Sequence, residues 1–531
     1  MVKDPGMYRR SLCGNREISE LAWAAGMSRS ALGRRGAEAN DARIGEVRCS
    51  RSSCEVGEQI RATGSGVDGA KASNQGEHGP DTLSLPQRRE IEVSGLERVR
   101  QRSKSQPKEG MTALMHHLTV AALWQAYDRL KRKAAPGVDG VTWQEYGENL
   151  IPRLTELHQR LQSNRYRPQP SRRCYIAKAD GRQRPLGIAA LEDKIVQGAV
   201  VEVLNAIYEP AFMGFSHGFR PGRNPHQALD ALAYGIRCRP VNWILDADIA
   251  SFFDTVDHDW LLRFLEHRIA DRRLLRLIKL WLEAGVLEAG RLIASEEGTP
   301  QGAVISPVLA NIYLHYVFDL WAHRWRRQQA RGEVILVRYA DDLVVGFEHE
   351  WEARRFLEAL RERMEQFGLK LHPEKTRLLE FGRHATVRRA RRGLGKPETF
   401  NFLGFTHICG RSRQGNFLLM RQTRRDRMRA KLRELKAELR KRMHQPIPVV
   451  GRWLGQVVRG YFQYHAVPTN NPRLAAFRFF VGRLWWRTLR RRSQRDGFSA
   501  KRLARLVKDW LPNPKILHPW PEARFAVNHP R

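Results

Sequence analysis

The sequence predicts a mixed α+β region followed by an all-α C-terminal region, and two patterns lead to this prediction. From about residue 136 to residue 412, helical apolar patterns alternate with short runs of strand-forming residues, which is typical of α+β domains. Beyond residue 420, apolar residues recur at helical spacing and no strand signal competes. The 531 residues, of which 42% are hydrophobic, are enough for a sizeable core in about two to four domains.

Four segments follow from these patterns. Residues 1–90 are rich in Gly, Ser, Arg and Glu and poor in large apolar residues, so we expect a mostly disordered basic and polar tail. Residues 91–135 form an N-terminal helical extension. A Pro-Gly turn then opens the mixed region at 136–412. Residues 413–531 form the helical region, whose first helix ends before Pro446.

The charge of the chain predicts a polyanionic partner. Lys and Arg number 92 against 56 acids, which gives a formal charge of +36 and a pI near 10.7. Nucleic acid is the economical explanation, and an anionic membrane surface is the alternative. We expect no membrane association, because no apolar run reaches the roughly 18 residues needed to span a bilayer.

The cysteines and the N-terminus predict a cytoplasmic protein. The six cysteines, at positions 13, 49, 54, 174, 238 and 409, lack the paired spacing of a zinc site, so we interpret them as reduced thiols. The N-terminus has no apolar signal segment and contains acids, which a transit peptide avoids. We therefore expect a cytoplasmic ribonucleoprotein that is associated with the nucleoid when it acts on DNA.

Two neighbouring acids, Asp341 and Asp342, lie between runs of strand formers at 334–337 and 343–345. This pattern predicts a β-hairpin with the acids at its tip. Adjacent carboxylates repel each other, but they suit hard divalent cations that need oxygen ligands. An acidic turn without a metal is the alternative. On so basic a chain, a metal site here indicates phosphoryl transfer on nucleic acid.

A second acidic cluster follows the apolar stretch that begins at Trp243. This stretch reads as a buried strand that runs into a turn or helix, and its alternation places Asp246 and Asp248 on one side. Opposed to Asp341 and Asp342 across a sheet, one of these acids could complete a two-metal site. The spacing does not choose between Asp246 and Asp248, and helix capping is the alternative role for either.

Eight motifs occur in the order found in the reverse transcriptases encoded within group II introns, and over about residues 115–525 the chain resembles this reverse transcriptase/maturase family. They are KAAPGVDG at 133–140, RQRPLGI at 182–188, GFRPGR at 218–223, the Asp248 segment, GTPQG at 298–302, YADD at 339–342, LHPEKT at 371–376 and FLGF at 402–405. The resemblance implies a right-hand polymerase, with fingers, an antiparallel palm sheet and an all-α thumb/maturase domain.

The resemblance also implies a metal site. It assigns Asp248, Asp341 and Asp342 to two Mg²⁺ ions, with help from the Ile249 carbonyl, and so selects Asp248 over its neighbour. Phe253 resembles the aromatic gate, the ring that would collide with a ribose 2′-hydroxyl and so favour deoxynucleotides. A packed core phenylalanine is the alternative.

Further motif positions imply contacts with the nucleotide and the primer. Lys178 and Arg184 match positions that grip the incoming triphosphate, where a cation offsets developing charge. Gln301 matches a residue that lines the nucleotide pocket, between two glycines that would let the backbone approach substrate closely. Arg220 and Arg223 would contact template or primer phosphates, although a structural turn explains the intervening Pro-Gly equally well. Lys375 would lie near the primer end.

The C-terminal region combines basic and aromatic residues. Residues 421–442 contain 11 basic residues against three acids, which fits a helix tracking a nucleic-acid backbone. Six aromatics lie among further arginines and could stack on unpaired bases or form the core: Trp453, Tyr461, Phe462, Tyr464, Trp485 and Trp486. Residues 459–464 resemble the family's thumb or maturase region, which implies intron RNA binding and help with splicing.

The sequence thus leads us to expect an RNA-directed DNA polymerase that also acts as a maturase. The implied partners are group II intron RNA, an RNA template, a DNA primer or target DNA, and dNTPs. No nuclease pattern follows the maturase-like region, so we expect no second-strand cleavage. A non-catalytic RNA chaperone is one alternative. A reverse transcriptase of a retron, defence or CRISPR-associated system is the other.

Overall fold

The structure is a computed structural model that describes residues 85–177, 183–288, 291–293, 297–298, 302–492 and 499–528. Lys178, Gln301 and most of the tail expected at 1–90 lie outside the described residues. The helix α2 (Leu85–Ser105) begins within the segment assigned to that tail, so the helical extension starts earlier than the sequence predicts.

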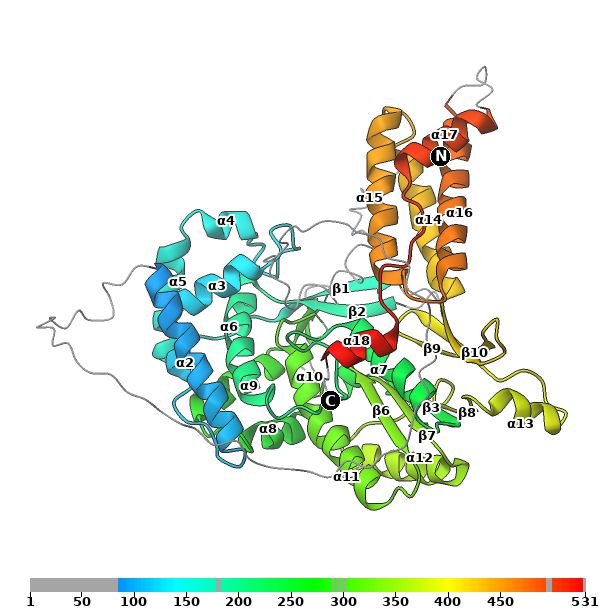
Figure 1. The fold of residues 1–531 in the computed structure, drawn as a ribbon. Helices are drawn as coiled ribbons and strands as arrows, with labels where there is room; N and C mark the ends of the chain where they lie inside the picture. Colours follow the sequence, from blue (N-terminus) through cyan, green and yellow to red (C-terminus); the bar gives the residue numbers. More distant parts are fainter. Residues whose placement is uncertain are drawn as a thin grey trace, which may run out of the picture.

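A helical layer forms one side of the molecule (Figure 1). Its large shared core surrounds α6, in which Ile195, Val200 and Leu204 are fully buried. The layer contains α2, α3 (Val120–Arg129), α4 (Trp143–Gly147), α5 (Leu150–Gln162), α6 (Leu191–Tyr208), α8 (His258–Glu266) and α9 (Arg272–Glu283).

A four-stranded antiparallel sheet in the order β6-β7-β3-β8 lies at the centre. Both of its faces are buried: Leu336 and Val345 face the large core, whereas Val337 and Val344 face a second core formed with α7. This explains why its strands read as nearly continuous apolar runs. The elements are β3 (Trp243–Asp248), β6 (Val334–Tyr339), β7 (Asp342–Phe347), β8 (Arg377–Glu380), α7 (Pro225–Cys238), α10 (Ser306–Leu314), α11 (Leu320–Gln328) and α12 (Glu350–Glu365).

Two smaller sheets flank the central one. The first has the order β2-β1-β4-β5, with β1 (Ser171–Ala177), β2 (Gln183–Ile188), β4 (Val286–Glu288) and β5 (Arg291–Ile293). The second has the order β11-β10-β9, with β9 (Phe400–Phe402), β10 (Phe405–Arg411) and β11 (Phe417–Thr423), and it follows the short helix α13 (Ala385–Arg391). The strand β11 lies beyond residue 412, where only helices were expected, because it completes a hairpin with β10.

The C-terminal helices form a bundle that rises away from the sheets (Figure 1). Its core contains Leu435, Leu454, Phe477 and Trp485. The last helix, α18, does not belong to the bundle but returns to lie beside α7. None of the described helices is long and apolar enough to cross a membrane. The elements are α14 (Arg425–Lys441), α15 (Ile447–His465), α16 (Asn471–Leu489), α17 (Ala500–Trp510) and α18 (Pro521–Asn528).

Candidate active site

The predicted acidic hairpin is confirmed. Strands β6 and β7 pair from Val334 to Phe347, and their last pair, Tyr339 with Asp342, leaves Ala340 and Asp341 as a two-residue turn. Ala340 has a φ of 55°, the left-handed conformation that tight hairpin turns require. Asp341 therefore lies at the tip and Asp342 begins the returning strand.

The strand register brings Asp248 opposite this hairpin. Asp248, the last residue of β3, pairs with Asp342 of the antiparallel neighbour β7. Residues directly opposite each other across such strands project to the same face, with Cβ atoms about 5 Å apart. Carboxylates that are 94 positions apart in the sequence are thus adjacent at one end of the sheet.

Asp246 lies on the same face but farther from the tip, opposite Val344 on one side and Arg377 on the other. Burial raises the pKa of its carboxyl group to about 6, against the lowering effect of the Arg377 charge. Its nearest cross-strand neighbours include no carboxylate. The geometry therefore pairs Asp248, and not Asp246, with the acids of the hairpin.

Negative charge is concentrated at the tip. Desolvation, followed by repulsion from Asp341 and Asp248, raises the pKa of Asp342, although its side chain remains solvent-accessible. The pKa of Asp341 is also raised, by desolvation first, and the charges of Arg184 and Lys375 oppose this rise. A group of acids that resists full ionisation is a feature of sites that work with an added cation.

Lys375 provides one positive charge within this group. Its Nζ lies 2.5 Å from Asp248 Oδ2, and the backbone N–H of His372 donates to the Asp248 carbonyl at 2.7 Å. No group of three or more His, Cys, Asp or Glu side chains in the described parts of the chain is arranged to hold a metal ion as it stands. The donor set nevertheless fits a hard divalent cation, because it consists of carboxylate oxygens that repel one another.

The hairpin tip rests on a buried network that sequence reasoning missed. The guanidinium of the fully buried Arg338 donates to both carboxylate oxygens of Asp319, at 2.7 and 2.6 Å, and to the Ala340 carbonyl at 3.2 Å. It also donates to Asn311, whose amide donates to the Gly218 carbonyl at 2.7 Å. An arginine within an otherwise apolar strand was the available signal.

Gly218 explains part of the GFRPGR motif. A Cβ atom at this position would lie 2.3 Å from the Ala340 nitrogen, so only glycine lets the two backbones approach this closely. The motif therefore packs against the backbone of the acidic tip.

Two glycines of the GTPQG motif also make close approaches. Gly298 lies against the Phe253 carbonyl and Gly302 against the Gly187 carbonyl of β2, with hypothetical Cβ distances of 2.8 and 2.7 Å. These approaches are to protein backbone, whereas the sequence led us to expect substrate. The half-buried Phe253 packs edge-on against the buried Phe252 at 5.5 Å between ring centroids.

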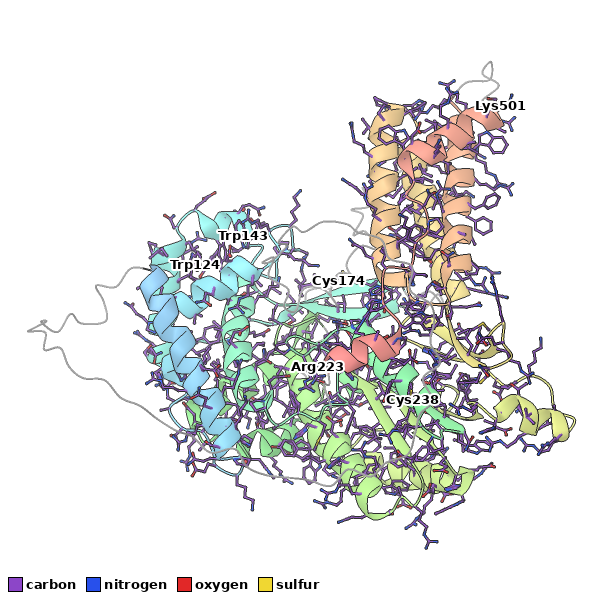
Figure 2. The ribbon with its side chains drawn as sticks, viewed as in Figure 1. Trp124, Trp143, Cys174, Arg223, Cys238 and Lys501 are labelled. Carbon is purple, nitrogen blue, oxygen red and sulfur yellow. The ribbon has the colours of Figure 1, made fainter. Side chains whose placement is uncertain are left out.

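Arg220 does not have the exposed position that phosphate contact requires. Its side chain is 3% exposed and pairs with Glu209 at 2.7 Å, while it also donates to the Met213 and Ser216 carbonyls. The structural turn is thus the correct interpretation for Arg220. Arg223, just before α7 (Figure 2), is half-buried, and its guanidinium makes no hydrogen bond or ion pair with any described residue.

Most of the C-terminal aromatics belong to the core. Trp485 is fully buried, Phe462 is 4% exposed, and Tyr461 stacks on Phe477 at 3.6 Å. Tyr464 donates a hydrogen bond to the Leu403 carbonyl and so ties the bundle to the sheets. Two other aromatics of the described bundle are exposed, Phe479 and Phe480 on α16.

The basic face of α14 is present. Six of its basic side chains are exposed and form no ion pair with a described residue: Arg425, Arg427, Arg429, Arg433, Lys436 and Arg440. Figure 2 shows nitrogen-tipped side chains projecting around the bundle. The opposite face of α14 packs into the bundle through Met428, Leu435 and Leu439.

A family described as reverse transcriptase (RNA-dependent DNA polymerase) matches residues 176–407. The chain is 34% identical to Protein YkfC of Escherichia coli K12 over 313 residues, which cover 53% of this chain and 77% of that protein. It is 28% identical to an uncharacterized 91 kDa protein in cob intron of Schizosaccharomyces pombe over 418 residues, 67% of this chain and 51% of that one. It is 37% identical to the group II intron-encoded protein LtrA of Lactococcus lactis subsp. cremoris over 225 residues, 41% of this chain and 37% of LtrA.

Proposed function

The chain belongs to the reverse transcriptase/maturase family of group II introns, and we propose that it copies intron RNA into cDNA and binds that RNA to assist splicing and mobility. The observation that supports this proposal best is the register of Asp248 opposite Asp342, next to Asp341 at the hairpin tip. Full retention of this acidic set favours an active polymerase over a chaperone that only binds RNA.

In this proposal the central sheet is the palm, the β1–β2 region belongs to the fingers, and α14–α17 form the thumb/maturase domain. Residues 136–412 would contain fingers and palm and 413–531 the thumb, with the β10–β11 hairpin joining them. Residues 1–90 would lie outside the polymerase core, apart from the start of α2.

Asp248, Asp341 and Asp342 would hold two Mg²⁺ ions, with the Ile249 carbonyl as an additional ligand. When bound, such ions activate a primer 3′-hydroxyl and stabilise the leaving pyrophosphate. The chain itself orients the acids: the register fixes Asp342 opposite Asp248, and Lys375 holds the Asp248 carboxylate in place.

The nucleotide would lie between the acidic tip and β2. Arg184 on β2 is close enough to influence the Asp341 carboxylate, so its charge could offset that of a dNTP triphosphate beside the metal site. Lys178 and Gln301 would complete the contacts. Phe253, which follows β3 in the sequence, would exclude nucleotides that carry a 2′-hydroxyl.

The bundle would contact the RNA and the RNA template–DNA primer duplex. Six exposed basic side chains on α14, which form no ion pair within the described parts of the chain, provide a surface for phosphates. Binding through this surface should weaken steeply with salt, because each phosphate contact releases counterions.

Substitution of the acids tests the proposal. We expect Asp341→Ala and Asp248→Asn each to abolish cDNA synthesis on a primed RNA template, because each removes a metal-binding carboxylate. RNA affinity should stay unchanged. Incorporation of dNTPs by the purified full chain, measured over a range of Mg²⁺ concentrations, checks the first statement, and a binding titration checks the second.

Asp246→Asn is the matched control, because Asp246 lies on the same strand and face but opposite Val344. It should retain most of the synthesis. Near-normal synthesis by Asp341→Ala would refute the metal assignment. Splicing assistance by the unsubstituted chain without any dNTP incorporation would instead favour the RNA chaperone.

A further inference from the structure

A basic segment extends beyond the edge of the central sheet and has no role in the proposed active site. It is the connection between β8 and β9, residues 382–399, here called the basic arm. It contains six basic residues and one acid, Glu398. Its helix α13 lies at the far right of Figure 1, away from the helical layer. Because β8 is the outer strand of its sheet, the arm lies on an open side of the molecule.

Both ends of the basic arm are held firmly. At its start, a Cβ atom on Gly382 would lie 2.2 Å from the Val241 carbonyl, so the chain leaves the sheet in close backbone contact. At its end, Arg377 on β8 donates to the Thr399 carbonyl at 3.2 Å and pairs with Glu398 at 3.8 Å. The arm is thus presented by the sheet in a defined position.

A buried acid orients α13. Glu380, 5% exposed at the end of β8, pairs with Arg388 at 3.2 Å and also with Arg392. These two arginines are four residues apart and so share one face of the helix. Glu380 is the acid of the described chain that forms ion pairs with this helix face. The two ion pairs turn the face toward the sheet.

The other four basic residues of the arm form no ion pair with a described acid. Arg383 and Arg389 each donate to a backbone carbonyl, of Arg237 at 3.0 Å and Gly395 at 3.1 Å. A carbonyl is a neutral acceptor, so these bonds position the guanidinium without neutralising it and leave other N–H groups available. Arg391 and Lys396 are exposed and make no hydrogen bond or ion pair with a described residue.

This arrangement is that of a surface for an anionic partner. A solvated helix face usually mixes charges of both signs, because like charges close together repel. Here four cations that pair with no acid among the described residues surround one seven-residue helix, which spans about 10 Å. Repulsion of this kind contributes nothing to folding, but it favours a partner with closely spaced negative charges such as the phosphates of a nucleic-acid helix.

We propose that the basic arm, through Arg383, Arg389, Arg391 and Lys396, binds the phosphate backbone of an RNA helix outside the polymerase active site. The inference deepens the proposed function, on which the choice of RNA rests. It adds a second RNA contact, on a part of the molecule that lies apart from the bundle (Figure 1). Contacts with phosphates carry no sequence information, so the contact would be independent of RNA sequence.

The test removes the two exposed charges, Arg391 and Lys396, that make no hydrogen bond or ion pair with a described residue. The full chain with Arg391→Gln and Lys396→Gln is compared with the unsubstituted chain in binding titrations. The probes are a labelled RNA duplex of about 20 base pairs and a DNA duplex of the same sequence, over a series of salt concentrations. The matched control is Arg327→Gln with Arg361→Gln on α11 and α12, because these arginines are also exposed and make no hydrogen bond or ion pair with a described residue.

We expect the arm variant to bind the RNA duplex roughly tenfold more weakly, with a log–log salt slope shallower by about 2, or about 1 for each lost contact. The control should change neither. The single substitution Lys396→Gln, in the loop after α13, should produce about half of the slope change without altering the helix.

An unchanged RNA affinity, or an equal loss in the control, would overturn the proposal. A loss confined to the DNA duplex would show that the arm binds DNA instead. Primer extension on a short primed RNA template separates the two inferences. The arm variant should extend the primer normally, whereas failure of the unsubstituted chain to extend it would refute the polymerase and leave the binding result to be judged alone.

Discussion

Phe253 is positioned by its neighbours rather than by its own burial. It lies directly beyond β3 in a short 3₁₀ turn, Phe252–Asp254, whose preceding residue Ser251 has a φ of 48°. Phe252 points into the core, and Gly298 lies against the Phe253 carbonyl. The ring of Phe253 is therefore only half-buried, in the turn that follows β3.

Shortening this side chain should relax the choice of sugar. We expect Phe253→Val to lower the ratio of kcat/KM for dNTPs over rNTPs about ten- to 200-fold, because the space that excludes a 2′-hydroxyl opens. Single-nucleotide primer extension with each nucleotide type measures this ratio. Phe480→Val, on the exposed face of α16, is the control and should leave it unchanged. An unchanged ratio in Phe253→Val would make Phe253 a packing residue.

Single residues differ in how far their roles could be predicted from the sequence. Asp341 and Asp342 were placed correctly because a hairpin is a local structure set by neighbouring residues. The role of Arg220 was not predicted correctly, because the sequence shows its motif but not its ion pair with Glu209. Asp246 and Asp248 could be separated by the register with β7, which no local pattern contains.

At the scale of elements, the acidic hairpin depends on an ion pair that joins β6 to the short helical segment His315–Asp319, between α10 and α11. Arg338 and Asp319 are both fully buried, and Arg338 also binds the Ala340 carbonyl at the tip. The Arg338 charge holds the pKa of Asp319 below its usual value in spite of burial. The pair thus holds the Ala340 carbonyl, and with it the hairpin tip, in place.

Removal of one partner of the Arg338–Asp319 ion pair should lower the free energy of unfolding of the chain. We expect Arg338→Ala to destabilise the chain by about 3–5 kcal/mol, because Asp319 is left as an uncompensated buried charge. The midpoint of urea unfolding, followed by circular dichroism, measures the loss. Arg361→Ala on the exposed face of α12 should cost less than about 0.5 kcal/mol.

The double variant Arg338→Met with Asp319→Leu separates stability from function. It should recover most of the stability, since no buried charge remains. It should not recover cDNA synthesis, because the contact with Ala340 is still missing. Full recovery of synthesis would show that the hairpin tip needs no such support.

The elements themselves were predicted where apolar periodicity is local and continuous, as in β3, β6, β7 and α14. The end of the mixed region was misplaced because β11 carries arginine and glutamine among its apolar residues and obtains its strand partner only from β10. The docking of α18 was not foreseen either. Its partners lie on α7, nearly 300 positions earlier, and local sequence contains no information on such contacts.

At the scale of the whole molecule, the C-terminal segment 511–528 connects the bundle back to the sheets. Arg524 pairs with Asp230 on α7 at 3.1 Å, and Glu522 pairs with Arg237 at 2.6 Å. The ring of His518 stacks on that of His226 at 3.9 Å. Since α18 lies beside α7, this connection ties the bundle to the part of the molecule that contains the central sheet (Figure 1).

Both histidines must be neutral for this docking. His518 Nδ1 lies 2.9 Å from the Arg524 guanidinium, which can only donate, so this nitrogen accepts and Nε2 donates to the Gln463 carbonyl. Burial, together with the neighbouring His518, lowers the pKa of His226 to about 4. Burial likewise lowers the pKa of His518, and the charges of Arg524 and Arg421 act in the same direction.

The docking of α18 should therefore weaken in acid. Below the ordinary histidine pKa of about 6.5, the undocked state binds more protons than the docked one. Through His226 alone, docking therefore loses up to about 1.4 kcal/mol per pH unit until the folded pKa of about 4 is reached. Hydrogen exchange in 521–528, measured from neutral pH downward, should accelerate beyond the intrinsic pH effect over this window. His226→Gln should flatten the response, whereas His444→Gln, at an exposed site, should preserve it.

Because His407 and His465 are also buried and neutral, global unfolding in acid would not distinguish this effect. Exchange in α18 that follows the bundle core at every pH would contradict a separate, histidine-dependent docking step.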